Sequence, residues 1–125
     1  LAFLVLVGAD LLTVVIVSTQ EPLTVVAVLH GELLHLCYLS VRSGEPIYLS
    51  VDKDVLAPAY ASTDWDQGTM ALETLLDICG AVAGSRKLLG ADVCGELPAS
   101  KGGTHADFVK NSVANSSILE RICYI

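Results

Sequence analysis

Two aspartates separated by one residue, Asp52 and Asp54, are the side chains of this 125-residue chain best placed to do chemistry. They follow an apolar, β-branched run at residues 47–51, which is typical of a buried strand. Because side chains alternate along a strand, we expect both carboxylates on one side of its carboxyl end, where ligands of open parallel sheets bind. Two carboxylates that converge in a low-dielectric site repel each other unless a cation separates them. Mn²⁺ and Mg²⁺ prefer oxygen ligands, so the spacing predicts a site for one of these metals.

A simpler interpretation of the same pair needs no metal. Asp52 would cap the turn that follows the strand, and Asp54 would be a solvated surface carboxylate. The sequence around the pair has to decide between the two interpretations.

The aspartates must be positioned by the strands and helices that the rest of the chain forms. Short apolar runs predict five buried strands, at residues 3–7, 13–17, 24–29, 47–51 and 88–93. Helical periodicity predicts helices at residues 32–42, 70–82 and 107–123, the last of them weakened by polar residues in its middle. Thr69 is the expected N-cap of the second helix, and Glu73 lies in its first turn, where the helix dipole favours a negative charge.

The order of these elements and the composition together predict the fold class. Strands and helices alternate in the later part of the chain, as expected for a parallel sheet with crossover helices. Hydrophobic residues make up 53% of the chain and aromatic ones 6%, so aliphatic residues suited to strands covered on both faces dominate. We therefore predict a single α/β domain over residues 1–125, with three αβα layers around a mostly parallel sheet. The chain begins on an apolar strand without a methionine, so we expect this domain to be incomplete at its N-terminus.

Charge and cysteine usage exclude several classes of partner. The formal charge is −7 and the seven basic residues are scattered, so the chain lacks the basic stripe that nucleic acids and anionic membrane surfaces require. The apolar stretch at residues 1–17 contains Asp10, which would cost about 2.5–3.5 kcal/mol at the centre of a membrane-spanning helix. Two short strands explain that stretch better. The four cysteines show no metal-binding spacing, which indicates free thiols and a cytoplasmic protein.

The residues that follow the aspartates form a recognisable order. A hydrophobic residue and Pro58 come next, then a loop with Trp65, Gln67 and Gly68 ahead of a helix, then a strand that ends in Glu96 ahead of Pro98. This order resembles the arginase superfamily, the ureohydrolases and their relatives. The resemblance covers residues 47–98 and implies an arginase-like fold.

The resemblance also implies roles for individual residues. Asp52 would bridge two Mn²⁺ ions and Asp54 would bind one of them, with Mg²⁺ as the alternative metal. A hydroxide on the metals would attack a carbon that bears nitrogen in a small-molecule substrate. Glu96 would hold the cationic or polar end of that substrate. Trp65 and Gln67 are further candidates for substrate binding, although Trp65 could equally pack across the sheet end and Gln67 could simply shape the loop.

The chain departs from the family pattern at two positions. Lys53 stands between the aspartates, where ureohydrolases have an aliphatic residue, and we expect its side chain to point away from them and to affect packing. Glu96 lies one place later than the family's substrate carboxylate, where this chain has Gly95. Either a bulge at Gly95 re-aims Glu96 or its role differs, so guanidine substrates are not favoured. The variant resembles an uncharacterised bacterial branch of the superfamily.

The remaining metal ligands of the family come from a histidine and an Asp-x-His-x-Asp motif, which this chain does not contain. Its three histidines, His30, His35 and His105, are expected to be surface or core residues. Two carboxylates cannot hold a dinuclear centre by themselves. The sequence therefore predicts a metal-dependent hydrolase of C–N bonds if the missing ligands are supplied, and otherwise a non-catalytic or degenerate arginase-like domain. Homo-oligomerisation is left open.

Other enzyme families also place Asp-x-Asp after a strand. In a haloacid-dehalogenase-like phosphatase Asp52 would be the nucleophile and Asp54 the general acid, but a threonine normally follows the second aspartate, and this chain has Val55. A nucleotide-sugar transferase with a metal-binding Asp-x-Asp is a further alternative that nothing else in the sequence supports.

Overall fold

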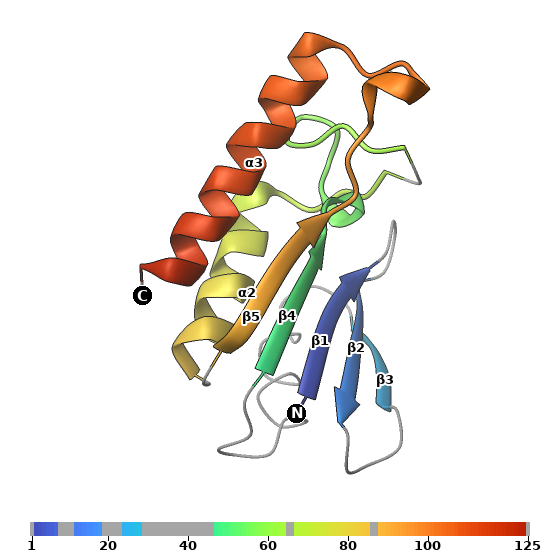
Figure 1. Cartoon of the computed structure of the whole chain (residues 1–125). Coiled ribbons are helices and arrows are strands. Elements are labelled where there is room, and N and C mark those ends of the chain that lie inside the picture. Colours follow the sequence, from blue (N-terminus) through green and yellow to red (C-terminus); the bar gives the residue numbers. More distant parts are fainter. Residues whose placement is uncertain are drawn as a thin grey trace.

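The computed structural model describes residues 2–7, 12–18, 24–28, 47–64, 67–85 and 88–124. Its strands are β1 (Ala2–Val7), β2 (Leu12–Ser18), β3 (Thr24–Val28), β4 (Ile47–Asp52) and β5 (Leu88–Cys94). Its helices are α2 (Leu72–Ser85) and α3 (His105–Cys123), with short 3₁₀ turns η1 (Lys53–Val55) and η2 (Ala99–Lys101) (Figure 1). Strands form at all five predicted positions, each within one residue at either end, but the prediction of burial is wrong for β5, in which every residue is exposed or partly exposed. The helix predicted at residues 32–42 lies outside the described residues.

The strands form one mixed sheet in the order β3-β2-β1-β4-β5. β4 pairs in parallel with both β1 and β5, whereas β2 runs antiparallel to β1 and β3. Only four residues separate β1 from β2 and five separate β2 from β3. Such connections are too short for the crossover that parallel neighbours require. The α/β class is confirmed, and the parallel arrangement holds for the β1-β4-β5 half of the sheet that carries the aspartates.

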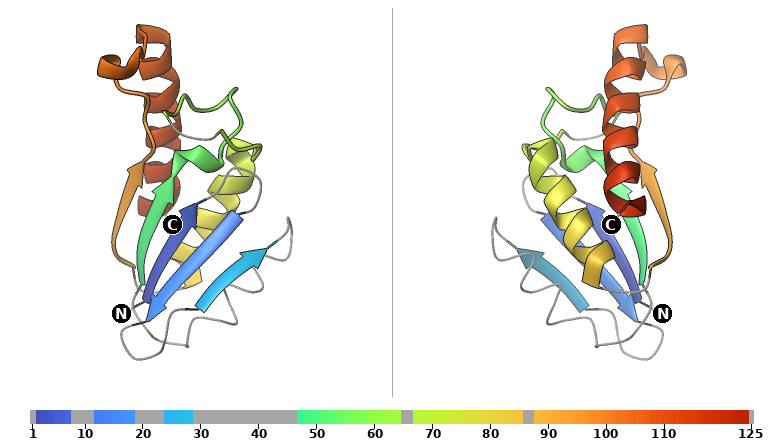
Figure 2. Two further views of the ribbon diagram at one scale, coloured as in Figure 1. Left: turned by 90° about the vertical axis from the view of Figure 1, so that its right-hand side faces the viewer. Right: turned by 90° about the vertical axis from the view of Figure 1, so that its left-hand side faces the viewer.

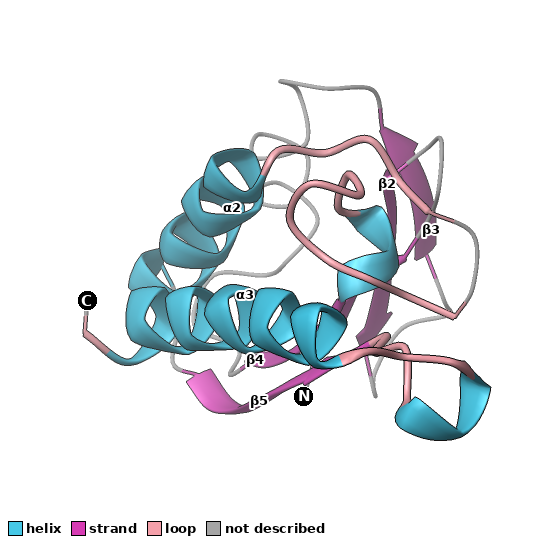
Figure 3. Cartoon of the chain, turned by 90° about the horizontal axis from the view of Figure 1, so that it is seen from above, coloured by secondary structure: helices cyan, strands magenta, loops and turns pink. Residues whose placement is uncertain are grey.

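Both described helices cover the same face of the sheet. The two side views agree on this arrangement (Figure 2), and so does the view down onto the carboxyl ends of β4 and β5 (Figure 3). α2 and α3 also pack against each other. Of the three predicted layers, helix–sheet–helix, the described residues therefore form two: the sheet and one layer of helices. None of the described helices is long and apolar enough to cross a membrane.

The core lies between β4 and these helices. Its fully buried side chains include Leu49 and Val51 of β4, Leu75 and Cys79 of α2, and Ile118 of α3. Burying a leucine, isoleucine or valine side chain stabilises the fold by about 1.5–3 kcal/mol. The periodic apolar positions of α2 and α3 therefore fix both helices against the strand that ends in Asp52.

The helix starts differ from the sequence predictions in an informative way. α2 begins at Leu72, so Thr69 is not its N-cap, although Glu73 does lie in the first turn as predicted. The backbone before α2 is used elsewhere, since the Met70 N–H donates to Val55 O at 3.0 Å. α3 begins two residues earlier than predicted, at His105, because Thr104 forms a capping box with Asp107.

Candidate metal centre

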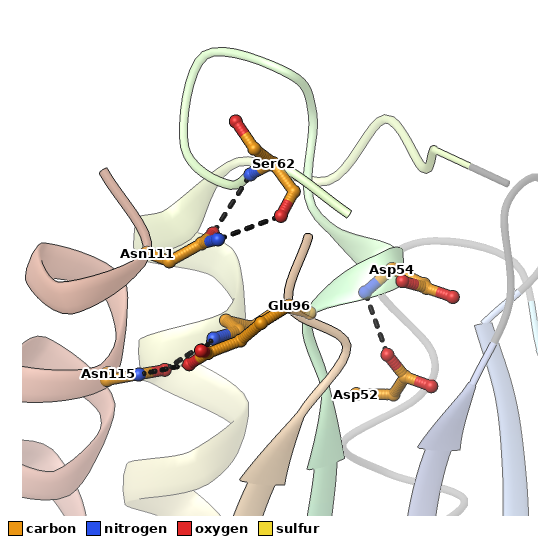
Figure 4. A network of polar contacts seen from close by, with 7 residues as sticks. Asp52, Asp54, Ser62, Glu96, Asn111 and Asn115 are labelled. Atoms are coloured by element: carbon orange, nitrogen blue, oxygen red, sulfur yellow. Dashed lines mark hydrogen bonds and ion pairs between the residues drawn. The ribbon is translucent and has the colours of Figure 1, made fainter. Parts of the chain in front are cut away.

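Asp52 and Asp54 stand at the carboxyl end of β4, as predicted, but a turn rather than strand alternation brings them together. Asp52 is the last residue of β4, and the chain then enters η1. The Asp52 Oδ1 accepts a hydrogen bond from the Asp54 N–H at 3.0 Å and so caps η1 (Figure 4). The capping part of the simpler interpretation is therefore right. Its other part is wrong, because only 7% of Asp54 is exposed.

The Asp54 carboxylate is buried without full compensation. Its Oδ1 is the one buried side-chain oxygen or nitrogen that accepts or donates no hydrogen bond within the described part of the chain. Burial first, and the nearby charge of Asp52 second, raise the Asp54 pKa to about 6, although a hydrogen bond with the Thr63 side chain acts in the opposite direction. A buried polar group without a partner is costly, and an ionised one more so. A cation beside Asp54 would remove that cost.

Gly95 closes the site from the neighbouring strand. It follows β5 with a φ of +85°, in the left-handed region. A Cβ on this residue would lie 2.2 Å from the Asp52 Oδ1 and 3.0 Å from the Asp54 Oδ1. The two carboxylate oxygens therefore converge beside the Gly95 backbone, which approaches them this closely only because it carries no side chain.

Lys53 and Glu96 form a separate polar cluster on the helix side of the turn. The Lys53 side chain is 0% exposed, and its Nζ donates to Glu96 Oε1 and to Asn115 Oδ1, both at 2.7 Å. The Asn115 Nδ2 donates to the same Glu96 oxygen at 2.7 Å. Hydrogen bonds from Lys53 and then Asn115 lower the Glu96 pKa. Figure 4 shows the Glu96 side chain directed toward α3 and away from the two aspartates.

The loop before α2 packs its backbone onto η1. The Gly68 N–H donates to Asp54 O at 2.6 Å, and a Cβ on Gly68 would lie 2.2 Å from Val55 O, so only glycine permits this approach. The Gln67 side-chain amide donates to Leu56 O and also accepts from Thr63. These contacts favour the loop-shaping interpretation of Gln67. Trp65 lies outside the described residues, and substrate binding by Trp65, Gln67 and Glu96 stays a prediction.

Polar residues at every fourth position of α3 support the loop and the turn, and sequence reasoning missed them. Asn111 binds both backbone groups of Ser62, accepting from its N–H at 2.9 Å and donating to its carbonyl at 2.8 Å. The Ser62 hydroxyl donates to Asp107 Oδ1 at 2.7 Å, and Asn115 binds Lys53 one turn further along. The signal was available in the four-residue spacing of Asp107, Asn111 and Asn115. Taken from the sequence alone, these polar residues predict only a weakened helix.

The described residues contain no group of three or more histidine, cysteine, aspartate or glutamate side chains arranged to hold a metal ion. His105 is exposed at the start of α3, where its ring stacks on Phe108 at a centroid distance of 6.4 Å. His30 and His35 lie outside the described residues. Cys94 pairs in register with Asp52, and burial and the neighbouring carboxylates raise the pKa of its thiol.

Known proteins resemble most of this chain in sequence and in fold. No protein-family model matches the chain. An uncharacterized protein of Thermotoga maritima is 41% identical over 86 residues, which is 69% of this chain and 35% of that protein. The crystal structure of a hypothetical agmatinase from Burkholderia thailandensis matches 75% of this chain and 29% of its own length, with 28% identity and a TM-score of 0.55. The predicted resemblance to the arginase superfamily is therefore confirmed.

A second solved structure has the same fold as this arginase-like chain. It is a proclavaminate amidinohydrolase from Streptomyces clavuligerus, with 24% identity and a TM-score of 0.53 over 74% of this chain and 31% of that one. The predicted arginase-like fold is thereby confirmed. The chain spans about a third of the length of the relatives it matches, at 35%, 29% and 31%.

Proposed function

We propose that this arginase-like chain contributes Asp52 and Asp54 to a manganese site of a hydrolase that cleaves a C–N bond in a small substrate. The observation that carries the proposal is the Asp54 Oδ1, a buried carboxylate oxygen without a hydrogen-bond partner among the described residues. It lies near a second carboxylate oxygen, that of Asp52, and both oxygens lie beside the backbone of Gly95. This arrangement is costly for the protein alone and favourable once a cation is bound.

The donor set supports a hard divalent cation. Carboxylate oxygens suit Mn²⁺ and Mg²⁺, whereas softer metals prefer thiolate or imidazole ligands. When bound, such a metal supplies a Lewis acid that generates a nucleophile from water at neutral pH. Asp52 and Asp54 would hold the metal, and the further ligands of a dinuclear centre would come from other residues of the assembly.

The names of the structural neighbours support the reaction class. One is described as a hypothetical agmatinase and the other as a proclavaminate amidinohydrolase, and both share this fold. We infer hydrolysis at carbon–nitrogen bonds for the complete enzyme, with a small molecule as its partner. Cys79, Cys94 and Cys123 are free thiols, which supports the cytoplasmic location that we propose.

Metal analysis and a calorimetric Mn²⁺ titration test the proposal, with Asp52→Ala and Asp54→Asn as site variants. Asp77→Ala is the matched control, because Asp77 is an exposed carboxylate on α2. We expect the unmodified chain and the control to bind Mn²⁺, and both site variants to lose binding. If the unmodified chain binds no Mn²⁺ at millimolar concentration, the hydrolase proposal fails for this chain and the non-catalytic alternative replaces it.

A further inference from the structure

We propose that Lys53 is a positioning residue that fixes the geometry of the Asp52–Asp54 pair through Glu96 and Asn115. The inference deepens the proposed metal site and rests on it for its functional meaning. It assigns Glu96 to this internal cluster in place of the substrate role that the family resemblance implies.

Lys53 is a charged residue in the interior of the protein. Its side chain is among the largest that are fully buried, at 0% exposure. A buried ammonium is unfavourable unless it is paired and hydrogen-bonded, and here one carboxylate oxygen and one amide oxygen lie at 2.7 Å. An aliphatic side chain would fill the same volume without this need. We therefore infer that the Lys53 ammonium group has a structural role, which is to hold its partners in position.

Lys53 joins segments that are far apart in the sequence. Lys53 belongs to η1, Glu96 follows β5, and Asn115 belongs to α3, so one ammonium group links three parts of the chain. The Asn115 amide also donates to the Glu96 oxygen that Lys53 binds, at 2.7 Å. The closed triangle leaves each of the three side chains little freedom to rotate.

Lys53 and Glu96 are both direct sequence neighbours of residues at the carboxylate pair. Lys53 lies between the two aspartates, and Glu96 follows Gly95 directly. A Cβ on Gly95 would lie 3.1 Å from the Lys53 backbone nitrogen and 2.2 Å from the Asp52 Oδ1. The Lys53–Glu96 ion pair thus clamps together the two backbone segments that touch the carboxylate oxygens. Release of the clamp would let Gly95 and η1 move apart and would separate the oxygens from their common point.

Nuclear magnetic resonance of the metal-free chain tests the positioning directly. The variants are Lys53→Met and Glu96→Gln, and the readouts are the Gly95 amide signal and the carboxyl ¹³C signals of Asp52 and Asp54. Asn111→Ala is the matched control. Asn111 lies one helical turn from Asn115 on the same face of α3, but it binds Ser62 and not Lys53 or Glu96. We expect both clamp variants to shift all three signals, and the control to lower the melting temperature while leaving the signals in place.

A Mn²⁺ titration of the same folded variants gives the functional readout. We expect Lys53→Met to weaken Mn²⁺ binding about tenfold or more, as is common for residues that orient metal ligands, and Asn111→Ala to leave it unchanged. Unchanged Gly95 and carboxyl signals in Lys53→Met would overturn the inference whether or not the chain binds metal. If Lys53→Met does not fold, the same signals are measured in Glu96→Gln, and unchanged signals in that variant would overturn the inference. A chain whose signals shift as expected but which binds no Mn²⁺ would retain the positioning role and refute the proposed function.

Discussion

Gly95 lies so close to Asp52 that a Cβ on Gly95 would stand 2.2 Å from the Asp52 Oδ1. Non-bonded carbon and oxygen atoms do not approach to that distance. The φ of +85° at Gly95 is also one that residues with a Cβ rarely adopt. The end of β5 therefore reaches the carboxylate pair only because position 95 carries no side chain.

We predict that Gly95→Ala impairs both stability and metal binding, and that Gly102→Ala is its matched control. Gly102 has a similar φ of +89°, but a Cβ there would meet nothing within 4 Å. Both variants incur the cost of the left-handed conformation, about 1–2 kcal/mol. Only Gly95→Ala also displaces Asp52, so it should lose more stability in urea unfolding and should lose Mn²⁺ binding in calorimetry. Equal losses in the two variants would show that the contact with Asp52 has no consequence.

The parts of the fold that depend on local composition could be predicted from the sequence. Short apolar runs favour the strand conformation, and all five became strands. The position of the aspartates at the carboxyl end of β4 follows from the run that precedes them. The sequence predicts that the two carboxylates converge, but it attributes this to the alternation of side chains along a strand. In the structure the strand ends at Asp52, and the turn that Asp52 caps directs Asp54 inward.

The parts that depend on distant pairing could not be predicted from the sequence alone. Nothing local to Lys53 shows that its ammonium meets Glu96 and Asn115, which lie 43 and 62 residues further along the chain. Thr69 has a side chain suited to capping α2. The backbone N–H of the next residue, Met70, is instead hydrogen-bonded to the Val55 carbonyl in η1, and α2 begins only at Leu72. The start of α3, by contrast, was predictable from Thr104 and Asp107, whose spacing is that of a capping box.

Asn111 anchors the loop at Ser62, and its replacement should destabilise the chain without changing the Asp52–Asp54 pair. Asn111 is 3% exposed and binds both backbone groups of Ser62. The Ser62 carbonyl keeps a second partner in the Leu97 N–H at 3.0 Å, so the Ser62 N–H is the group that Asn111→Ala leaves unpaired. We expect a loss of about 1–3 kcal/mol in urea unfolding. Ser116→Ala, an exposed position on the same helix, is the control, and a loss no larger than its own would contradict this account.

Asp107 should make stability fall in acid. Hydrogen bonds from the Thr104 backbone, the Ser62 hydroxyl and the Thr104 hydroxyl lower the Asp107 pKa to about 2, from 3.8 in the unfolded chain. Its contribution is therefore fully present above about pH 4 and is lost as the pH falls through the folded value. Urea midpoints of the unmodified chain and of Asp107→Asn should differ at pH 5 and converge toward pH 2. A difference that stays constant across this range would refute the assignment.

Asp54 should produce the opposite dependence at higher pH. Its pKa is raised from 3.8 to about 6 by burial and by Asp52, so between these values the folded chain holds a proton that the unfolded chain has lost. In the absence of metal, the contribution of Asp54 to stability is therefore most favourable below about pH 4 and decreases as the pH rises toward 6. We expect Asp54→Asn to remove this slope in urea unfolding measured from pH 4 to 7. Because Mn²⁺ competes with the same proton, its apparent affinity for the unmodified chain should rise through the same window. A metal-free chain whose stability does not change between pH 4 and 6 would show that the buried Asp54 oxygen is compensated in solution, and the main argument for a cation there would be lost.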